Sequence, residues 1–134
     1  MKKEIIINAQ GGILGRIAAF SAKQALLGKK VIIVNCNEIL ITGEKNKVKE
    51  KYLVLRKKGG TSIKGPRISK MPEKIMKRTI RGMLSHKQGR GSDAFNRIRC
   101  YNTCPAECEH AEKIEMKRPA KTKLTKLLDV SREL

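Results

Sequence analysis

Blocks of apolar residues divide the first part of the chain into three elements. Residues 4–8 hold three consecutive isoleucines and stop at a Gln-Gly-Gly turn, a pattern typical of a short buried strand. Residues 13–27 place aliphatic and small side chains at helical spacing, which predicts an amphipathic helix ending at Gly28. Residues 30–35 form a second apolar run. Because the connections are short, strand, helix and strand predict a parallel βαβ unit.

The next stretch is more polar and carries three weaker signals. Residues 38–41 are expected either to extend the sheet or to form a short extra strand. Residues 44–57 predict a mostly polar helix. Its narrow apolar seam consists of Val48, Tyr52 and Leu55. Residues 57–71 show no helical or strand periodicity of apolar residues and are rich in Gly and Lys, so they predict an exposed loop. A loop of that length is more often functional than accidental.

A further helical pattern begins at Pro72, a residue suited to the first turn of a helix. The side chains expected to face the core are Ile75, Met76, Thr79, Ile80 and Met83. The opposite side carries Lys74, Lys77, Arg78 and Arg81. Residues 85–91 predict a basic loop, after which Ser92 or Asp93 is expected to cap a short helix. Residues 98–101 predict a late strand.

The last third of the chain is weakly patterned. Its expected apolar patch consists of Leu124, Leu127 and Leu128. The chain has 134 residues, of which 40% are apolar and 3% aromatic. This length and composition predict a single domain with an aliphatic core.

Charge is distributed unevenly along the chain. The sequence holds 31 Lys and Arg against 12 Asp and Glu, a net charge of +19. Residues 45–99 carry 18 basic and 3 acidic side chains, a net of +15, whereas residues 1–44 carry +3 and residues 100–134 carry +1. Such a surface seeks a polyanion, most commonly nucleic acid and less commonly an anionic membrane. The middle is therefore expected to bind the polyanion, and the last third is expected to be peripheral.

Membrane and export signals are weak. No apolar run approaches the roughly eighteen residues of a membrane span, and the apolar stretch at residues 5–7 is too short for a signal peptide. The sequence therefore predicts a cytoplasmic protein without a membrane partner.

A glycine-rich turn raises the alternative of nucleotide binding. Gly11, Gly12 and Gly15 precede a helix N-terminus, where a doubly wound fold would cradle a phosphate. The spacing is neither G-x-G-x-x-G nor a P-loop. A tight turn with close packing of the helix on the sheet is the favoured interpretation, and no cofactor is expected.

The cysteines raise the alternative of a structural zinc site. Cys100, Cys104 and Cys108 lie near His110, but their three-residue spacers are wider than the usual Cys-x2-Cys knuckle. The favoured interpretation is free thiols, with Cys36 in the core beside a strand. No metal is therefore assigned.

Side chains for catalysis are scarce. His86 lies in a basic loop without a motif-placed partner, so a phosphate or ribose contact is the favoured role. An RNA-modifying or nucleotide-using enzyme is the second hypothesis. It would need an acidic or nucleophilic group beside the glycine turn, and the nearby acid, Glu38, belongs to no motif. We therefore expect no enzyme and no small-molecule substrate.

The basic segment favours folded RNA as its partner. Its cations are interleaved with glycines, which let the main chain approach phosphates closely. Stacking on single-stranded bases would need aromatic side chains, and only Tyr52, Phe95 and Tyr101 are available. The pattern therefore indicates contact with the backbone of folded RNA. The cations selected by charge alone are Lys57, Lys58, Lys64, Arg67, Lys70, Lys77 and Arg78.

Several ordered motifs resemble the universal large-subunit ribosomal protein thirteen family, in its archaeal form. They are residues 8–18 (NAQGGILGRIA), 28–35 (GKKVIIVN), 48–58, 72–75 (PEKI) and, most distinctively, 81–91 (RGMLSHKQGRG). The chain departs from the family pattern at Asn8, where Asp is usual, at Ser85, where Pro is usual, and at Thr103, where Gly is usual.

The resemblance implies a Rossmann-like, three-layer α/β fold, with a central, mostly parallel sheet flanked by helices. It implies an RNA-binding domain over residues 1–105, followed by a partly helical extension over residues 106–134. It also implies a structural role in the large ribosomal subunit, with ribosomal RNA and neighbouring ribosomal proteins as partners. The RNA contacts carried over from the motifs are Arg16, Arg81, His86, Lys87 and Arg90.

Overall fold

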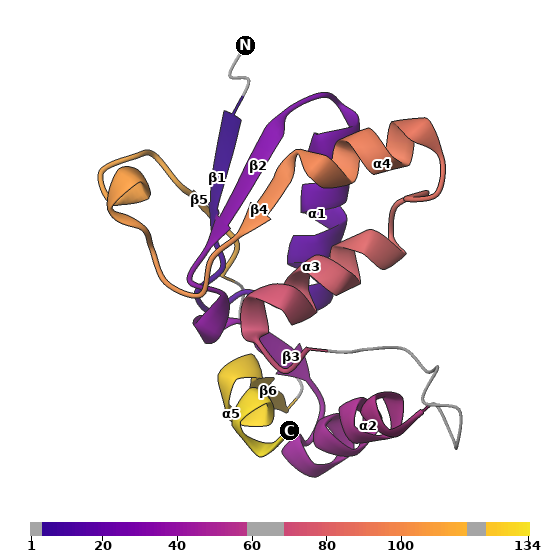
Figure 1. Cartoon of the computed structure of the whole chain (residues 1–134). Coiled ribbons are helices and arrows are strands. Elements are labelled where there is room, and N and C mark those ends of the chain that lie inside the picture. The colour runs from indigo at the N-terminus through magenta and orange to yellow at the C-terminus, as the bar shows by residue number, and fades with distance from the viewer. Residues whose placement is uncertain (1–3, 59–68, 118–122) are drawn as a thin grey trace.

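The amino-terminal βαβ unit has the predicted form. The computed structural model describes residues 4–58, 69–117 and 123–134. Strand β1 (Glu4–Asn8), helix α1 (Leu14–Leu26) and strand β2 (Lys30–Val34) follow one another along the chain (Figure 1). The two strands are parallel, with Glu4 opposite Lys30 and Asn8 opposite Val34.

The central sheet has four strands in the order β4-β2-β1-β5. Strand β4 (Ile98–Cys100) pairs with β2, and strand β5 (Ile114–Glu115) pairs with β1. Both pairings are parallel, as is the pairing of β1 with β2. The predicted α/β fold with a mostly parallel central sheet is confirmed.

One face of the sheet is covered by helices. Helices α3 (Pro72–Gly82) and α4 (Gly89–Asn96) both contact α1, and both contact β4 (Figure 1). The core between them is aliphatic, as predicted, and its largest fully buried side chains include Ile17, Met76 and Ile80. Arg97, after α4, donates a hydrogen bond to the carbonyl oxygen of Ala25 over 2.9 Å. This bond ties the end of α4 to the last turn of α1.

The other face of the sheet is covered by an irregular segment. This segment leads from β4 to β5 and contains the single 3-10 turn η3 (Ala106–Cys108). Cys108 is buried against Ile32 and Val34 of β2. A short stretch that holds three Glu and one Lys therefore closes the second face.

A smaller unit built from two distant parts of the chain lies beyond one edge of the main body (Figure 1). Strand β3 (Leu40–Thr42) pairs antiparallel with strand β6 (Leu124–Lys126) in a separate two-stranded sheet. Helix α2 (Lys45–Lys57) and helix α5 (Leu127–Glu133) contact each other beside it. Of the two alternatives for residues 38–41, the structure therefore has the short extra strand.

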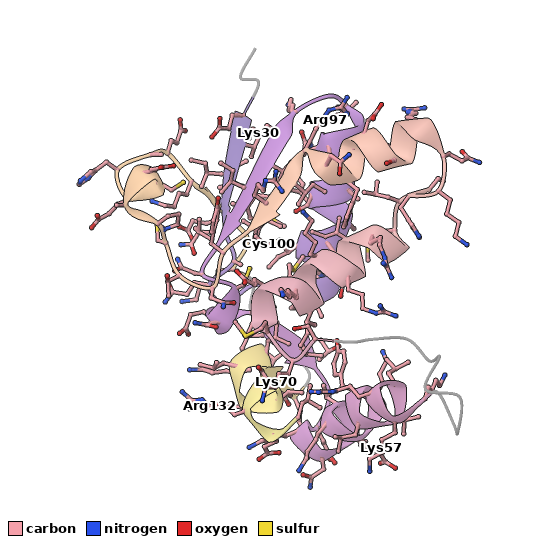
Figure 2. The ribbon with its side chains drawn as sticks, in the orientation of Figure 1. Lys30, Lys57, Lys70, Arg97, Cys100 and Arg132 are labelled. Carbon is pink, nitrogen blue, oxygen red and sulfur yellow. The ribbon has the colours of Figure 1, made fainter. Side chains whose placement is uncertain are left out.

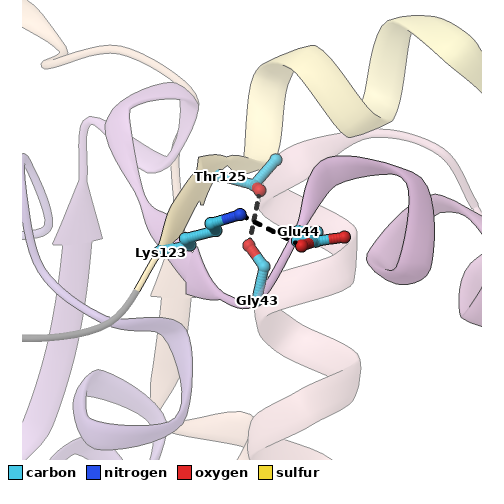
Figure 3. Close-up of polar contacts among 4 residues, drawn as sticks. All are labelled: Gly43, Glu44, Lys123 and Thr125. Carbon is cyan, nitrogen blue, oxygen red and sulfur yellow. Dashed lines mark hydrogen bonds and ion pairs between the residues drawn. The ribbon is translucent and has the colours of Figure 1, made fainter.

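Side-chain contacts fix this two-stranded sheet (Figure 3). The hydroxyl of Thr125 donates to the carbonyl oxygen of Gly43 over 3.0 Å. The ammonium of Lys123 lies 3.1 Å from the carboxylate of Glu44. These contacts join the C-terminal strand to the start of α2, 79 residues earlier in the sequence.

Three sequence expectations are wrong. Met83 was expected to face the core but is 46% exposed, because α3 ends at Gly82 and the turn that follows buries Leu84 instead. The basic loop was expected to reach residue 91, but helix α4 already begins at Gly89. The last third was expected to be peripheral, yet Leu127 and Val130 are fully buried.

Candidate nucleic-acid interface

The glycine turn after β1 is closed by its own hydrogen bonds. The amide of Gly11 donates to the carbonyl oxygen of Glu38 over 3.1 Å, and that of Gly12 donates to Ala9 over 3.0 Å. Gly11 has a φ of +71°, which explains the glycine there. A Cβ at Gly12 would lie 2.6 Å from the side chain of Ile17. Both amides are thus engaged inside the protein, which supports the interpretation as a packing turn.

Four basic side chains of α3 and one of β4 border the same hollow. It has a volume of about 410 Å³ and lies between α3, α4 and β4. Its cationic lining consists of Lys74, Lys77, Arg78, Arg81 and Arg99. Glu73 is the one acidic residue among its described lining. Helix α3 therefore holds together three of the predicted contacts, namely Lys77, Arg78 and Arg81.

Lys77 differs from the other cations of this group because its ammonium is held internally. The ammonium donates to the carbonyl oxygen of Ile98 over 2.7 Å and lies 4.7 Å from the centroid of the Phe95 ring. Burial lowers the pKa of Lys77, and the neighbouring charge of Arg99 acts in the same direction. Lys77 is therefore held within the hollow and has less freedom than Arg78 to contact a ligand at the surface.

The turn between α3 and α4 carries His86 and Lys87, and Arg90 follows in the first turn of α4. His86 is half-buried, whereas Lys87 and Arg90 are exposed. The turn is tight because the amide of Gln88 donates to the carbonyl oxygen of Ser85 over 2.9 Å. A Cβ at Gly91 would lie only 2.0 Å from that same oxygen. Gly91 therefore allows the first turn of α4 to lie directly on the Ser85 backbone.

The remaining predicted contacts lie elsewhere. Arg16 is exposed in the first turn of α1, and Lys57 and Lys58 are exposed at the end of α2. The carbonyl oxygen of Lys70 accepts a hydrogen bond from the Ser131 hydroxyl of α5. Figure 2 shows Lys57 at the end of α2 and Lys70 beside α5. Lys64 and Arg67 fall outside the described residues.

Sequence reasoning missed two side chains of this site as contacts, Lys74 and Arg99. Arg99 lies on the three-residue strand β4, between the buried Ile98 and the half-buried Cys100. Strand alternation could have indicated that Arg99 points outward, but not that it meets α3, which precedes it by some twenty residues. Lys74 was recognised on the basic side of α3 and was not selected.

The cysteines separate into two pairs. Cys36 is fully buried and shares a side-chain hydrogen bond with Cys100, and this bond together with burial raises the pKa of the Cys36 thiol. Cys104 and Cys108 belong to the cluster on the other face of the sheet. All four thiols are free. Among the described residues, which include these cysteines and His110, no three His, Cys, Asp or Glu side chains are grouped as metal ligands.

The acid next to the glycine turn is engaged in an ion pair. A carboxylate oxygen of Glu38 lies 3.9 Å from the ammonium of Lys126 in β6. The main-chain carbonyl oxygen of Glu38 accepts the hydrogen bond from the Gly11 amide.

Within the described ranges, no helix combines the length and apolar character needed to cross a bilayer.

These features define a class of protein. The glycine turn serves packing, and the cations gather on a helix and a turn at the surface, as in a basic α/β protein that binds a polyanion along its exterior. Comparison with known proteins agrees. The family model described as ribosomal protein L13 matches residues 2–107.

Curated relatives extend the match over nearly the whole chain. A protein of Methanococcoides burtonii named large ribosomal subunit protein uL13 is 41% identical, and the alignment covers 96% of each chain. The protein of the same name from Archaeoglobus fulgidus is also 41% identical, over 96% of this chain and 86% of its own. The chain therefore belongs to the ribosomal protein L13 family, as its motifs indicated. This is a family of ribosomal structural proteins not known to be enzymatic, which confirms the expectation of a non-enzymatic role.

Proposed function

We propose that this chain is a structural constituent of the large ribosomal subunit that binds its ribosomal RNA through the basic segment of residues 57–91. Membership of the ribosomal protein L13 family supports the first part, since the curated relatives are named large ribosomal subunit proteins. The same relatives support a cytoplasmic location within the ribosome and a role in translation.

The assignment of RNA binding to this segment is supported by the cations that gather on α3 and the turn after it. Residues 69–99 hold nine Lys and Arg against two acids, Glu73 and Asp93. An ordinary solvated surface mixes the two signs, and this one does not. Phosphate groups of folded RNA are the matching partner, and each contact would release counterions.

The scaffold gives these cations fixed positions. Arg78 and Arg81 stand on a helix whose opposite side is anchored by the buried Ile75, Met76 and Ile80. The turn that carries Lys87 is held by the close contact between Gly91 and Ser85. Because these positions are set before RNA arrives, little ordering is needed on binding, which favours stable attachment during subunit assembly.

Binding to purified large-subunit ribosomal RNA tests this segment. The test variant changes Arg81, Lys87 and Arg90 to Ala. The matched control changes Lys23, Lys29 and Lys30 to Ala, which removes the same charge from the end of α1 and the start of β2, outside residues 57–91 (Figure 2 labels Lys30). Affinity is measured at several salt concentrations, and thermal unfolding is measured alongside.

The test variant should bind more weakly and lower the slope of log affinity against log salt by roughly one unit for each lost phosphate contact. The control should keep most of the wild-type slope, and both variants should unfold at nearly the wild-type temperature. Equal losses in the two triple variants would show that net charge alone drives binding. That result would overturn the assignment to this segment.

A further inference from the structure

The hollow bordered by α3, α4 and β4 joins a basic rim to an apolar wall. Its volume of about 410 Å³ lies within the range of sites that enclose a small ligand. The wall is formed by Ile75, Phe95 and Cys100. The rim carries Lys74, Arg78, Arg81 and Arg99. Contact with phosphates alone would use the rim and leave the wall without a partner.

Phe95 is fixed in this wall by Lys77. The Lys77 ammonium lies 4.7 Å from the ring centroid and is itself held by the carbonyl oxygen of Ile98. The ring also packs against the buried core of the protein. The part of the ring that Lys77 and the core leave exposed offers a contact for a planar base, and base–aromatic contact is a main source of affinity for unpaired nucleotides.

We propose that this hollow receives one unpaired nucleotide of the bound RNA, displaced from its helix. The base lies against the half-buried Phe95 and Cys100, and the flanking phosphates contact the guanidinium groups of Arg78, Arg81 and Arg99. This inference rests on the proposed function, because it names a single contact within the RNA-binding face. Folded RNA presents such nucleotides at bulges and loops.

The composition of the hollow favours a nucleotide over an acidic protein segment. Carboxylates would satisfy the rim but would leave the exposed parts of Phe95 and Cys100 uncovered, and they would face the carboxylate of Glu73. A base covers the apolar wall and can offer N–H donors to Glu73. Guanidinium groups suit phosphate because their planar fork can donate two hydrogen bonds to one group.

The test compares two RNA hairpins that differ in one nucleotide. One is fully paired, and the other carries a single bulged 2-aminopurine, whose fluorescence is quenched by stacking within the helix. The full-length protein is titrated into each, and both affinity and fluorescence are followed. Wild-type protein should prefer the bulged hairpin about tenfold, and the fluorescence of the bulge should change on binding.

Two variants assign the effect to the hollow. Phe95→Leu keeps an apolar side chain but removes the aromatic ring, and Arg99→Gln removes an exposed cation from the rim without touching the core. Phe95→Leu should abolish most of the preference for the bulge while leaving affinity for the paired hairpin unchanged. Arg99→Gln should weaken binding of the bulged hairpin more than binding of the paired one.

The outcomes separate this inference from the proposed function. Loss of binding to both hairpins and to ribosomal RNA would refute RNA binding itself. Equal affinity of wild-type protein for the two hairpins would overturn only the nucleotide site. Displacement of the bulged hairpin by a short polyglutamate peptide at a lower concentration than by unlabelled bulged RNA would overturn the nucleotide site and assign the hollow to an acidic protein segment. Tighter binding of free AMP than of the bulged hairpin would assign it to a free nucleotide.

Discussion

Gly91 offers a sharp test of how the basic turn is held in place. In Gly91→Ala, the new Cβ would lie 2.0 Å from the carbonyl oxygen and 2.3 Å from the carbonyl carbon of Ser85. A Cβ is not found closer than about 3 Å to backbone atoms of another residue, so the backbone at residue 91 or 85 must move by about 1 Å. The hydrogen bond from the Gln88 amide to the Ser85 carbonyl oxygen opposes this movement. Overpacking of this kind typically costs about 1–3 kcal/mol.

Gly89 is the matched control because it lies in the same helical turn. A Cβ at Gly89 would meet nothing within 4 Å. Gly89→Ala should therefore stabilise the protein by about 0.5–1 kcal/mol, since alanine limits the freedom of the unfolded chain. The same gain offsets part of the loss in Gly91→Ala, which leaves a net destabilisation of about 0–2.5 kcal/mol.

Thermal unfolding and RNA binding measure the two variants together. For a chain of this size, 1 kcal/mol corresponds to roughly 3–4 °C in the unfolding midpoint. Gly91→Ala should therefore unfold several degrees below Gly89→Ala. It should also bind ribosomal RNA more weakly, because Lys87 and Arg90 move with the turn. Equal midpoints for the two variants would refute the argument that backbone contact at Gly91 holds this turn.

Two further predictions concern polar contacts of the scaffold. Asn8→Asp installs the residue usual in the family and replaces the 3.0 Å hydrogen bond from Asn8 to Glu115 with a repulsion between two carboxylates. Thermal unfolding should show that this substitution lowers the free energy of unfolding by roughly 1 kcal/mol. The double variant with Glu115→Gln should recover this loss. A hydrogen bond from Lys45 lowers the pKa of Glu133 below its ordinary 4.5, so this contact stabilises above pH 4.5 and is lost as the pH falls through the lowered value. Unfolding midpoints of Glu133→Gln and wild type should accordingly differ slightly at pH 7 and converge in acid, whereas a difference that persists in acid would contradict this assignment.

Local pattern was sufficient for the elements that depend on neighbouring residues. Three isoleucines in a row predict β1, and the stripe that includes Leu14, Ile17 and Ala18 predicts α1, because burial imposes these periods directly. The basic side of α3 followed from the same reasoning. Helical spacing placed Ile75, Met76 and Ile80 inward, so the cations between them had to face out.

Features that depend on distant parts of the chain could not be predicted in this way. Strands β3 and β6 have three residues each, too few to show a period, and their partners lie some 80 residues apart. The hollow likewise needs Arg99 to meet α3, which no local pattern encodes. Gly91 could be recognised as a turn residue, but its contact with Ser85 exists only in the folded turn.

The measurement that tests the central claim most directly is sedimentation of a cell extract through a sucrose gradient, with the chain detected in each fraction. The protein should migrate with large ribosomal subunits at low salt and leave them only at high salt, because its attachment depends on cations meeting phosphates. The variant lacking Arg81, Lys87 and Arg90 should leave at lower salt than the variant lacking Lys23, Lys29 and Lys30. Recovery of the wild-type protein solely at the top of the gradient at low salt would contradict the account.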